Sequence, residues 1–302
     1  MAIRELNWDK IDEEIENLNK KEPKKEKKVD EHLFRYTPKN GEAVVLGRFL
    51  PPPVDDIDSM YAQVLQHSYK GSNGMLLLEK CPRSLSKSNK CPVCDHATDV
   101  YYGRNGTPEN KELGKKFFHK ASFYTNFLVI NDINNPENNG KIFVLKLDKK
   151  TFNEKIIAKI SPSEEERELG TEPVRVFDYV KGMNFKLKIV ERNIMIDGKP
   201  VLVPNYDASE WSNTITRISL DGKKPLTDDE INTLIEPKLI PLKPYIEENL
   251  KSYDKIKDRL DRVLGNTTTT TTQSSGDGFE KTLEQASSED DDASFLARLR
   301  GE

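Results

Sequence analysis

The sequence predicts a mostly β protein, an antiparallel barrel or sandwich, with helices added toward its C-terminal end. Three observations lead to this prediction. Short runs rich in aromatic and β-branched residues recur between polar turns from residue 41 to residue 206. Helical periodicity is limited to a short N-terminal stretch and to the region after residue 225. All three cysteines fall in one segment, KCPRSLSKSNKCPVC, residues 80–94.

Length and composition indicate one elaborated domain with appendages. The chain has 302 residues, of which 35% are hydrophobic and 32% are charged. It has no long apolar run and begins with a polar, charged stretch, so we expect a soluble protein that is not exported and that stays in a cytosol. Clustered cysteines in such a compartment are typical of reduced metal ligands more than of disulfides.

Residues 1–30 are predicted to form an N-terminal arm, a short helix on a flexible tether. Trp8, Ile11, Ile15 and Leu18 recur at helical spacing, and the charged run NKKEPKKEKK that follows is interrupted by Pro23. The apolar stripe would dock either on the protein's own core or on another subunit.

The expected strands begin with GEAVVLGRFL in residues 41–53. Two strands then flank the turn KGSNG at 70–74, and the segments 122–132 and 142–147 form a second hairpin. Further strands are predicted at 173–180 (PVRVFDYV) and at 183–197, the latter partly paired with 199–206.

Helices are predicted late in the chain. PLTDDEINTLI, residues 225–235, contains a capping-box pattern from Thr227 to Glu230. One helix is expected over 245–264, ending at Gly265. Its predicted apolar face consists of Ile246, Leu250, Tyr253, Leu260 and Leu264.

Residues 265–302 are predicted to be a low-complexity linker and a disordered acidic tail. This segment holds 8 acidic and 3 basic side chains, a net charge of −5, and residues 1–31 have a net charge of −2. Because the whole chain has a net charge of −4, residues 32–264 have a net charge of +3. A weakly basic body with an acidic tail is a charge asymmetry that requires an explanation, and a solvated, disordered terminus is the simplest one.

The cysteine segment predicts one Zn²⁺. Cys91 and Cys94 form a C-x-x-C pair, and Cys81 lies ten positions before Cys91. The fourth ligand is predicted to be His67, because folding at KGSNG brings its strand beside the end of the strand that precedes Cys81. The alternative is a group of buried thiols with no metal.

The other histidines fit less well. His32 is remote, His96 would crowd the turn that holds Cys94, and His119 follows a long loop with glycine and asparagine. Four protein ligands would close the coordination shell, so the zinc is predicted to be structural, and no enzymatic activity is expected. It would stabilise a loop-rich subdomain at about 61–117 that has few apolar residues.

The segment that follows the cysteines interleaves aromatic and basic residues. Cations neutralise phosphates and rings stack on unpaired bases, so this pattern indicates a surface for single-stranded nucleic acid, although strand aromatics also form cores. We expect about half of these rings, Phe127 among them, to be buried. The segment holds Tyr101, Tyr102, Phe117, Phe118, Phe123, Tyr124 and Phe127 with Arg104, Lys111, Lys115, Lys116 and Lys120.

The sequence resembles the helix-destabilising single-stranded DNA-binding proteins (gene 32 protein family) of T-even-type bacteriophages and related myoviruses. The resemblance rests on the spacing of His67, Cys81, Cys91 and Cys94, on GEAVVLGRFLP, on SFYTNFLVINDINNPENNGKIF and on NYDASEW at 205–211. It covers roughly residues 40–215. One departure is the arm, where MAIRELNWDK lacks the family's compact basic cluster.

The resemblance implies a five-stranded OB-fold core within residues 31–264, with an inserted zinc subdomain and a DNA cleft between the two. It implies cooperative coating of single strands in DNA replication, recombination and repair, self-association through the arm, and recruitment of replication and recombination proteins by the tail. The implied DNA contacts, together with Arg104 from the interleaved segment, are Arg48, Tyr101, Tyr102, Lys115, Lys116, Lys120, Phe123, Tyr124, Lys146 and Tyr206.

Two other hypotheses compete with this one. A zinc-stapled scaffold would use the same aromatic surface to bind proteins in a replication complex, without direct DNA contact. A metal-dependent hydrolase is less consistent with the sequence, which offers no paired carboxylates and no open metal position.

Overall fold

The computed structural model describes residues 30–103, 107–196 and 199–266. The helical stripe of the predicted arm and the predicted acidic tail lie outside these ranges, as does Arg104. Within the described ranges no helix is both long and apolar enough to cross a membrane.

In the described ranges the strands form one eight-stranded sheet, and all pairings between these strands are antiparallel, in agreement with the predicted mostly β fold. The strand order is β3-β2-β4-β1-β6-β7, with β5 paired to β4 and β8 paired to β6. The strands are β1 (Glu42–Leu50), β2 (Ala62–Lys70), β3 (Leu76–Lys80), β4 (Lys120–Asp132), β5 (Ile142–Asp148), β6 (Met183–Ile196), β7 (Lys199–Asn205) and β8 (Glu210–Ile215).

Both predicted hairpins are confirmed. β2 pairs β3 across the turn at 71–75, with His67 opposite Glu79. β4 pairs β5 from Ser122 opposite Asp148 to Leu128 opposite Ile142. The pairing of 183–197 with 199–206 is confirmed as β6–β7.

The main core lies where β1, β4, β5 and β6 meet. Phe49 and Phe127 are fully buried there, and their rings make an edge contact with centroids 5.1 Å apart. Gly47 allows this close packing, because a Cβ at this position would lie 2.3 Å from a ring carbon of Phe127. A register shift between Leu46 and Gly47 bends β1 at the same point.

Short helices connect the strands and follow the last of them as far as residue 264. The capping box from Thr227 to Glu230 is confirmed at the start of α7. The helices within the described residues are η1 (Pro82–Ser84), α2 (Pro92–Tyr102), α3 (Pro108–Phe117), η3 (Pro136–Asn138), α4 (Lys149–Thr151), η4 (Phe152–Ile157), α5 (Ala158–Ile160), α6 (Glu164–Glu168), α7 (Asp228–Leu234), η5 (Glu236–Lys238), α8 (Lys243–Glu247) and α9 (Tyr253–Leu264).

The predicted strand at 173–180 is wrong. This segment has no regular secondary structure, yet Val174, Val176 and Phe177 are buried in the main core. Its apolar residues cover the sheet as a connecting segment, so its hydrophobicity reflects burial and not strand pairing.

The single helix predicted over 245–264 is also wrong, because the structure divides it into α8 and α9. Lys80 of β3 donates hydrogen bonds to the carbonyl oxygens of Tyr245 and Glu248, at 2.7 and 2.6 Å, and so caps the end of α8. Asn249 then adopts a positive φ of 59°, and α9 starts anew after Ser252. Gly265, with φ 76°, ends α9 as predicted.

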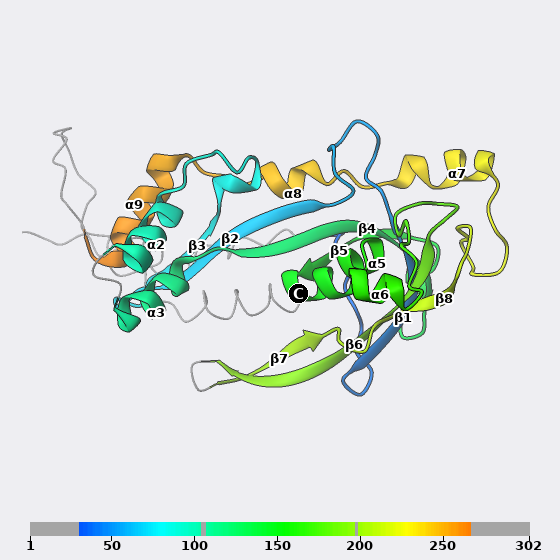
Figure 1. Ribbon diagram of the computed structural model, residues 1–302, viewed down its shortest axis with the longest axis horizontal. Helices are drawn as coiled ribbons and strands as arrows, with labels where there is room; N and C mark the ends of the chain where they lie inside the picture. The colour runs from blue at the N-terminus through cyan, green and yellow to red at the C-terminus, as the bar shows by residue number, and fades with distance from the viewer. Residues whose placement is uncertain (1–29, 104–106, 197–198, 267–302) are drawn as a thin grey trace, which may run out of the picture. The chain divides into compact units, whose positions relative to one another are not determined.

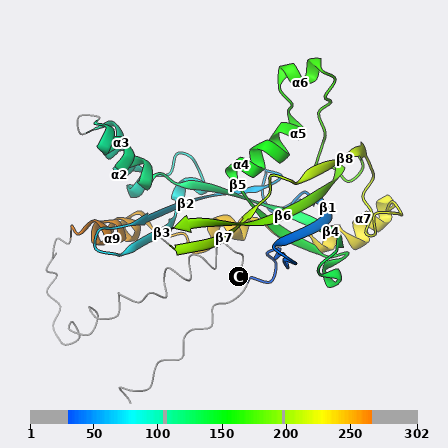
Figure 2. The same cartoon turned by 90° about the horizontal axis from the view of Figure 1, so that it is seen from below.

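Helix α9 packs against α2 and β3, and α2 packs against α3, so these elements form a second cluster beside the β2–β3 hairpin (Figures 1 and 2). The buried face of α9 consists of Ile256, Leu260 and Val263, which pack with Leu77 and the cysteine segment. Of the face predicted from the sequence only Leu260 is buried, because the break at 248–252 resets the helical register.

Candidate metal centre and cation surface

Three elements bring the candidate metal ligands together. His67 projects from β2, Cys81 directly follows β3, and Cys91 and Cys94 lie at the start of α2. The Cys81 amide donates to the carbonyl of Leu65 at 2.8 Å, which continues the hairpin ladder as far as the first sulfur. All four side chains predicted as ligands are buried.

Three of the distances between these donor atoms match a tetrahedral zinc site. Bond lengths of about 2.3 Å to sulfur and about 2.0–2.1 Å to nitrogen require ligand atoms separated by about 3.5–3.8 Å in a tetrahedron. His67 Nε2 lies 3.3 Å from Cys91 Sγ and 3.5 Å from Cys94 Sγ. The Cys81 and Cys94 sulfurs are 3.5 Å apart. This group of soft donors fits Zn²⁺ in both chemistry and spacing.

A backbone contact orients His67. Its Nδ1–H donates to the carbonyl oxygen of Phe117 at 2.8 Å, which leaves Nε2 as the lone-pair nitrogen facing the sulfurs. A hydrogen bond of this kind on the outer nitrogen is typical of metal-bound histidine, since it fixes both the tautomer and the ring orientation.

The side chains of the cluster share protons through their mutual hydrogen bonds. Burial lowers the pKa of His67, but hydrogen bonds with the Cys81 and Cys91 thiols outweigh it and raise the pKa to about 9. Hydrogen bonds from the Cys81 and Cys94 thiols lower the pKa of Cys91, whereas hydrogen bonds with Cys81 and Cys91 raise the pKa of Cys94. A metal binds thiolates and a neutral imidazole, so zinc binding at this cluster would release the protons held by Cys94 and by His67.

His119 is a fifth candidate ligand, which corrects the expectation that it lies too far along the chain. Its Nδ1 is 3.6 Å from Cys94 Sγ, and donor atoms of His67, Cys81, Cys94 and His119 all lie within 4.8 Å of one another. The described residues between Cys94 and His119 form two packed helices, α2 and α3, which return the chain to the metal cluster.

The pair Thr107-Pro108 is the sequence signal that could have predicted α3, the helix that leads the chain back to His119. Thr107 caps the helix by accepting a hydrogen bond from the Asn110 amide, and proline occupies the first helical position. His119 is only half-buried, unlike the four predicted ligands.

The second cluster is larger than the predicted subdomain at 61–117, since α9 supplies part of its core. A buried carboxylate joins the two segments: Glu79 of β3 accepts from Lys251 at 2.7 Å and lies 3.3 Å from Arg259. Removing one partner of a buried charge destabilises a fold. The two ion pairs of Glu79 therefore hold Lys251 and the helix α9 against the strand that leads to Cys81.

Four of the predicted DNA contacts are exposed near this cluster. Tyr102, at the end of α2, is 72% exposed. Lys115 and Lys116 lie on α3, where Lys115 pairs with Glu112 at 2.6 Å, and Lys120 begins β4. Gly114 permits the two helices to pack closely, because a Cβ there would lie 2.7 Å from Tyr101 Cβ. The aromatic end of α2 and the basic end of α3 are therefore adjacent.

Four other predicted contacts, Tyr101, Tyr124, Lys146 and Tyr206, are half-buried. The Tyr124 ring stacks on Tyr245 with centroids 4.9 Å apart, and Lys146 Nζ lies 5.8 Å from the Tyr124 centroid. Burial raises the pKa of Tyr206, which packs against the main core.

Two predicted contacts are contradicted by burial. Arg48 has no exposed surface, and its guanidinium donates to the carbonyl oxygens of Asp178 and Thr216, both at 2.9 Å. Burial lowers its pKa to about 10 against the opposing effect of Asp178. Phe123 is buried in the main core, where it stacks on Phe152 with centroids 4.1 Å apart and planes 2° from parallel. Neither side chain is accessible to a nucleic acid in this structure.

Comparison with known proteins gives consistent matches. A family model described as gp32 DNA binding protein like matches residues 39–264, a range that includes the whole metal cluster and ends with α9. The single-stranded DNA-binding protein of Enterobacteria phage T2 is 29% identical over 229 residues, which cover 75% of this chain and 67% of that protein. The single-stranded DNA-binding protein of Enterobacteria phage T4 is 29% identical over 231 residues, with the same coverage of both chains.

Proposed function

Because the chain belongs to the gp32-like family of DNA-binding proteins, we propose that it binds single-stranded DNA, without strong sequence preference and without enzymatic activity. The relatives from phages T2 and T4 are both named single-stranded DNA-binding proteins. The observation that carries the proposal is the juxtaposition of an exposed ring, Tyr102, with the basic end of α3 beside the metal cluster. Rings stack on any base and lysines neutralise phosphates, so such a surface binds unpaired strands with little regard to sequence.

The metal proposed for this site is one structural Zn²⁺ held by His67, Cys81, Cys91 and Cys94. These four side chains are all buried, and the Phe117 carbonyl fixes His67 in the tautomer that a ligand needs. His119 is more exposed and remains outside this set as a neighbour of Cys94. The zinc would stabilise the packing of α2, α3 and α9 and so hold the DNA-binding surface in place.

The proposed architecture follows the family. Within residues 31–264 the main sheet would form an OB-fold core, supported by the bend in β1 and its antiparallel pairing with both β4 and β6. Residues 1–30 would act as an arm that mediates self-association along the strand. Residues 265–302 would act as an acidic tail that recruits replication and recombination proteins in the cytoplasm of an infected bacterium.

A titration with oligo-dT tests the proposal. Zinc-loaded protein is mixed with increasing oligo-dT while its tyrosine and tryptophan fluorescence is recorded at several salt concentrations. We expect quenching, and an affinity that falls linearly with salt on logarithmic axes.

A protein-binding scaffold is the alternative function, favoured by exposed apolar residues on the β6–β7 hairpin, Ile194, Met195 and Leu202. Unchanged fluorescence at low salt, together with no binding by an independent method, would support the scaffold and exclude DNA binding.

A further inference from the structure

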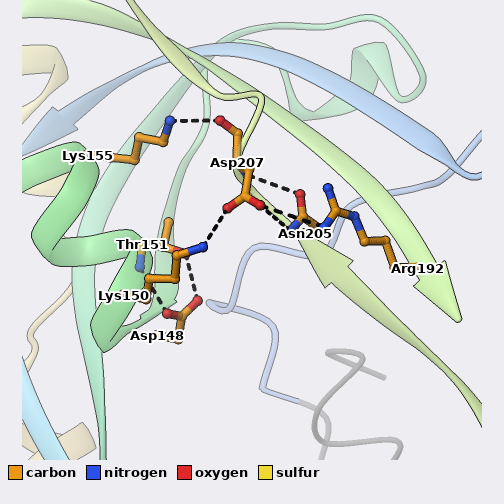
Figure 3. Close-up of polar contacts among 7 residues, drawn as sticks. All are labelled: Asp148, Lys150, Thr151, Lys155, Arg192, Asn205 and Asp207. Atoms are coloured by element: carbon orange, nitrogen blue, oxygen red, sulfur yellow. Dashed lines mark hydrogen bonds and ion pairs between the residues drawn. The ribbon is translucent and has the colours of Figure 1, made fainter. Parts of the chain in front are cut away.

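A cluster of cations outside the predicted DNA-contact set meets at the turn between β7 and β8. The carboxylate of Asp207 in this turn lies 3.3 Å from Lys150 Nζ through Oδ1 and 3.8 Å from Arg192 Nη1 through Oδ2. Lys155 Nζ donates to the Asp207 carbonyl oxygen at 2.8 Å. Figure 3 shows the three cations approaching Asp207 from different elements, α4, η4 and β6.

The neighbouring residues hold this arrangement in place. Asn205 donates to Asp207 Oδ2 at 2.9 Å and accepts from the Asp207 amide at 3.2 Å. Asp148 accepts from the amide and hydroxyl of Thr151, at 2.9 and 2.7 Å, and thereby fixes the start of α4 that carries Lys150 (Figure 3). Asp148 and Glu154 also attract Lys150, but Asp207 is the carboxylate that pairs with it directly.

The cluster continues the row of cations predicted from the sequence. Ser122 of β4 pairs with Asp148 of β5, so Lys120 and Lys150 each lie two residues beyond the same end of this two-strand ladder. A strand bound along α3 and the start of β4 would therefore meet Lys149 and Lys150 next.

A carboxylate held between cations resembles a bound phosphate. Both groups present paired oxygens to lysine and arginine donors, and both form charge-assisted hydrogen bonds with them. Lys150 and Arg192 remain 64% and 59% exposed while they face Asp207. They are therefore accessible to a ligand from solvent.

We propose that Lys150, Lys155 and Arg192 form a subsite for one backbone phosphate of single-stranded DNA, and that Asp207 occupies this subsite until DNA displaces it. The inference rests on the proposed function. Asp207 acts as an internal competitor, because its carboxylate pairs with Lys150 and Arg192 when no strand is bound.

The test compares oligo-dT affinity across salt concentrations for full-length, zinc-loaded variants. Each phosphate contact on a single strand contributes about 0.7 to the slope of log affinity against log salt, which is about fivefold in affinity between 1 M and 0.1 M salt. We expect Lys150→Ala and Arg192→Ala each to lower the slope by about 0.7 and to weaken binding about fivefold at 0.1 M. Asp207→Asn retains the side-chain shape, removes the competing charge and should strengthen binding about fivefold.

Two controls separate this effect from a general change in charge. Lys224→Ala removes a cation that is 78% exposed and lies 3.5 Å from Glu230, and Asp221→Asn removes a carboxylate that accepts from two amides in a turn. Both should leave the slope at the wild-type value.

The possible failures are distinct. Wild-type slopes for Lys150→Ala and Arg192→Ala would overturn the subsite and leave the proposed function intact. Weaker binding by Asp207→Asn would show that Asp207 organises the cations without competing, which overturns the displacement. No binding by the wild-type protein would overturn the proposed function, and the subsite with it.

Discussion

Replacing Leu260 with alanine tests whether the C-terminal helix belongs to the metal centre. Leu260 of α9 is 4% exposed and packs in the same cluster as Cys81, Cys91 and Cys94. Leucine-to-alanine changes at buried positions cost about 2–5 kcal/mol. One factor of ten corresponds to about 1.4 kcal/mol, so a loss confined to this cluster changes its local folding equilibrium by about thirtyfold to a few thousandfold.

Zinc affinity reports this loss, because metal binding and folding of a small metal-stabilised unit are coupled. We expect Leu260→Ala to lower the affinity for zinc at least tenfold in a competition assay with a chromogenic chelator. The matched control is Ile231→Ala on α7, which is 5% exposed but packs in a different cluster. It should lower the overall free energy of unfolding and leave zinc affinity unchanged. Equal zinc affinities for the two variants would refute the claim that α9 completes the metal subdomain.

Three further predictions concern the ligands, the stacking surface and the tail. His67→Ala should abolish stoichiometric zinc binding in metal analysis of the purified protein while His119→Ala retains one ion; the opposite result would exchange their roles. Tyr102→Ala should weaken oligo-dT binding by about 5- to 150-fold, because about 1–3 kcal/mol of stacking is lost. The control is Tyr253→Ala, which removes a 39% exposed ring on α9 and should leave binding unchanged. Equal effects of the two changes would exclude a stacking role for Tyr102. Deleting residues 266–302 should strengthen oligo-dT binding at low salt by removing a competing polyanion, and unchanged affinity would limit the tail to recruiting partners.

Local patterns predicted most of the sheet. Alternation and turn chemistry identified β1, both hairpins and the β6–β7 pair, because strand period and turn residues are properties of neighbouring positions. The same reasoning placed His67 beside the cysteines, since a hairpin fixes which residues lie opposite one another. The prediction of a strand at 173–180 failed because hydrophobicity indicates burial, and a connecting segment that covers the core is as apolar as a strand.

The other wrong predictions have a common cause, which is that they depend on contacts with residues far away in the sequence. The break between α8 and α9 depends on Lys80, which is far away in sequence and caps the carbonyls at the end of α8. Phe123 resembled a stacking ring in sequence, but Phe152 covers it in the fold. Arg48 resembled a surface cation, but carbonyls from two later segments surround it. Periodicity within a window contains no information about such partners.

The most direct test of the account is a competition titration of the zinc-loaded protein bound to fluorescent oligo-dT. Unlabelled oligo-dT and the oligo-dT·oligo-dA duplex of equal length are added separately at one salt concentration. The account predicts that the single strand displaces the probe at much lower concentration than the duplex, because paired bases cannot stack on an exposed ring. Displacement by the duplex at an equal or lower concentration would contradict it.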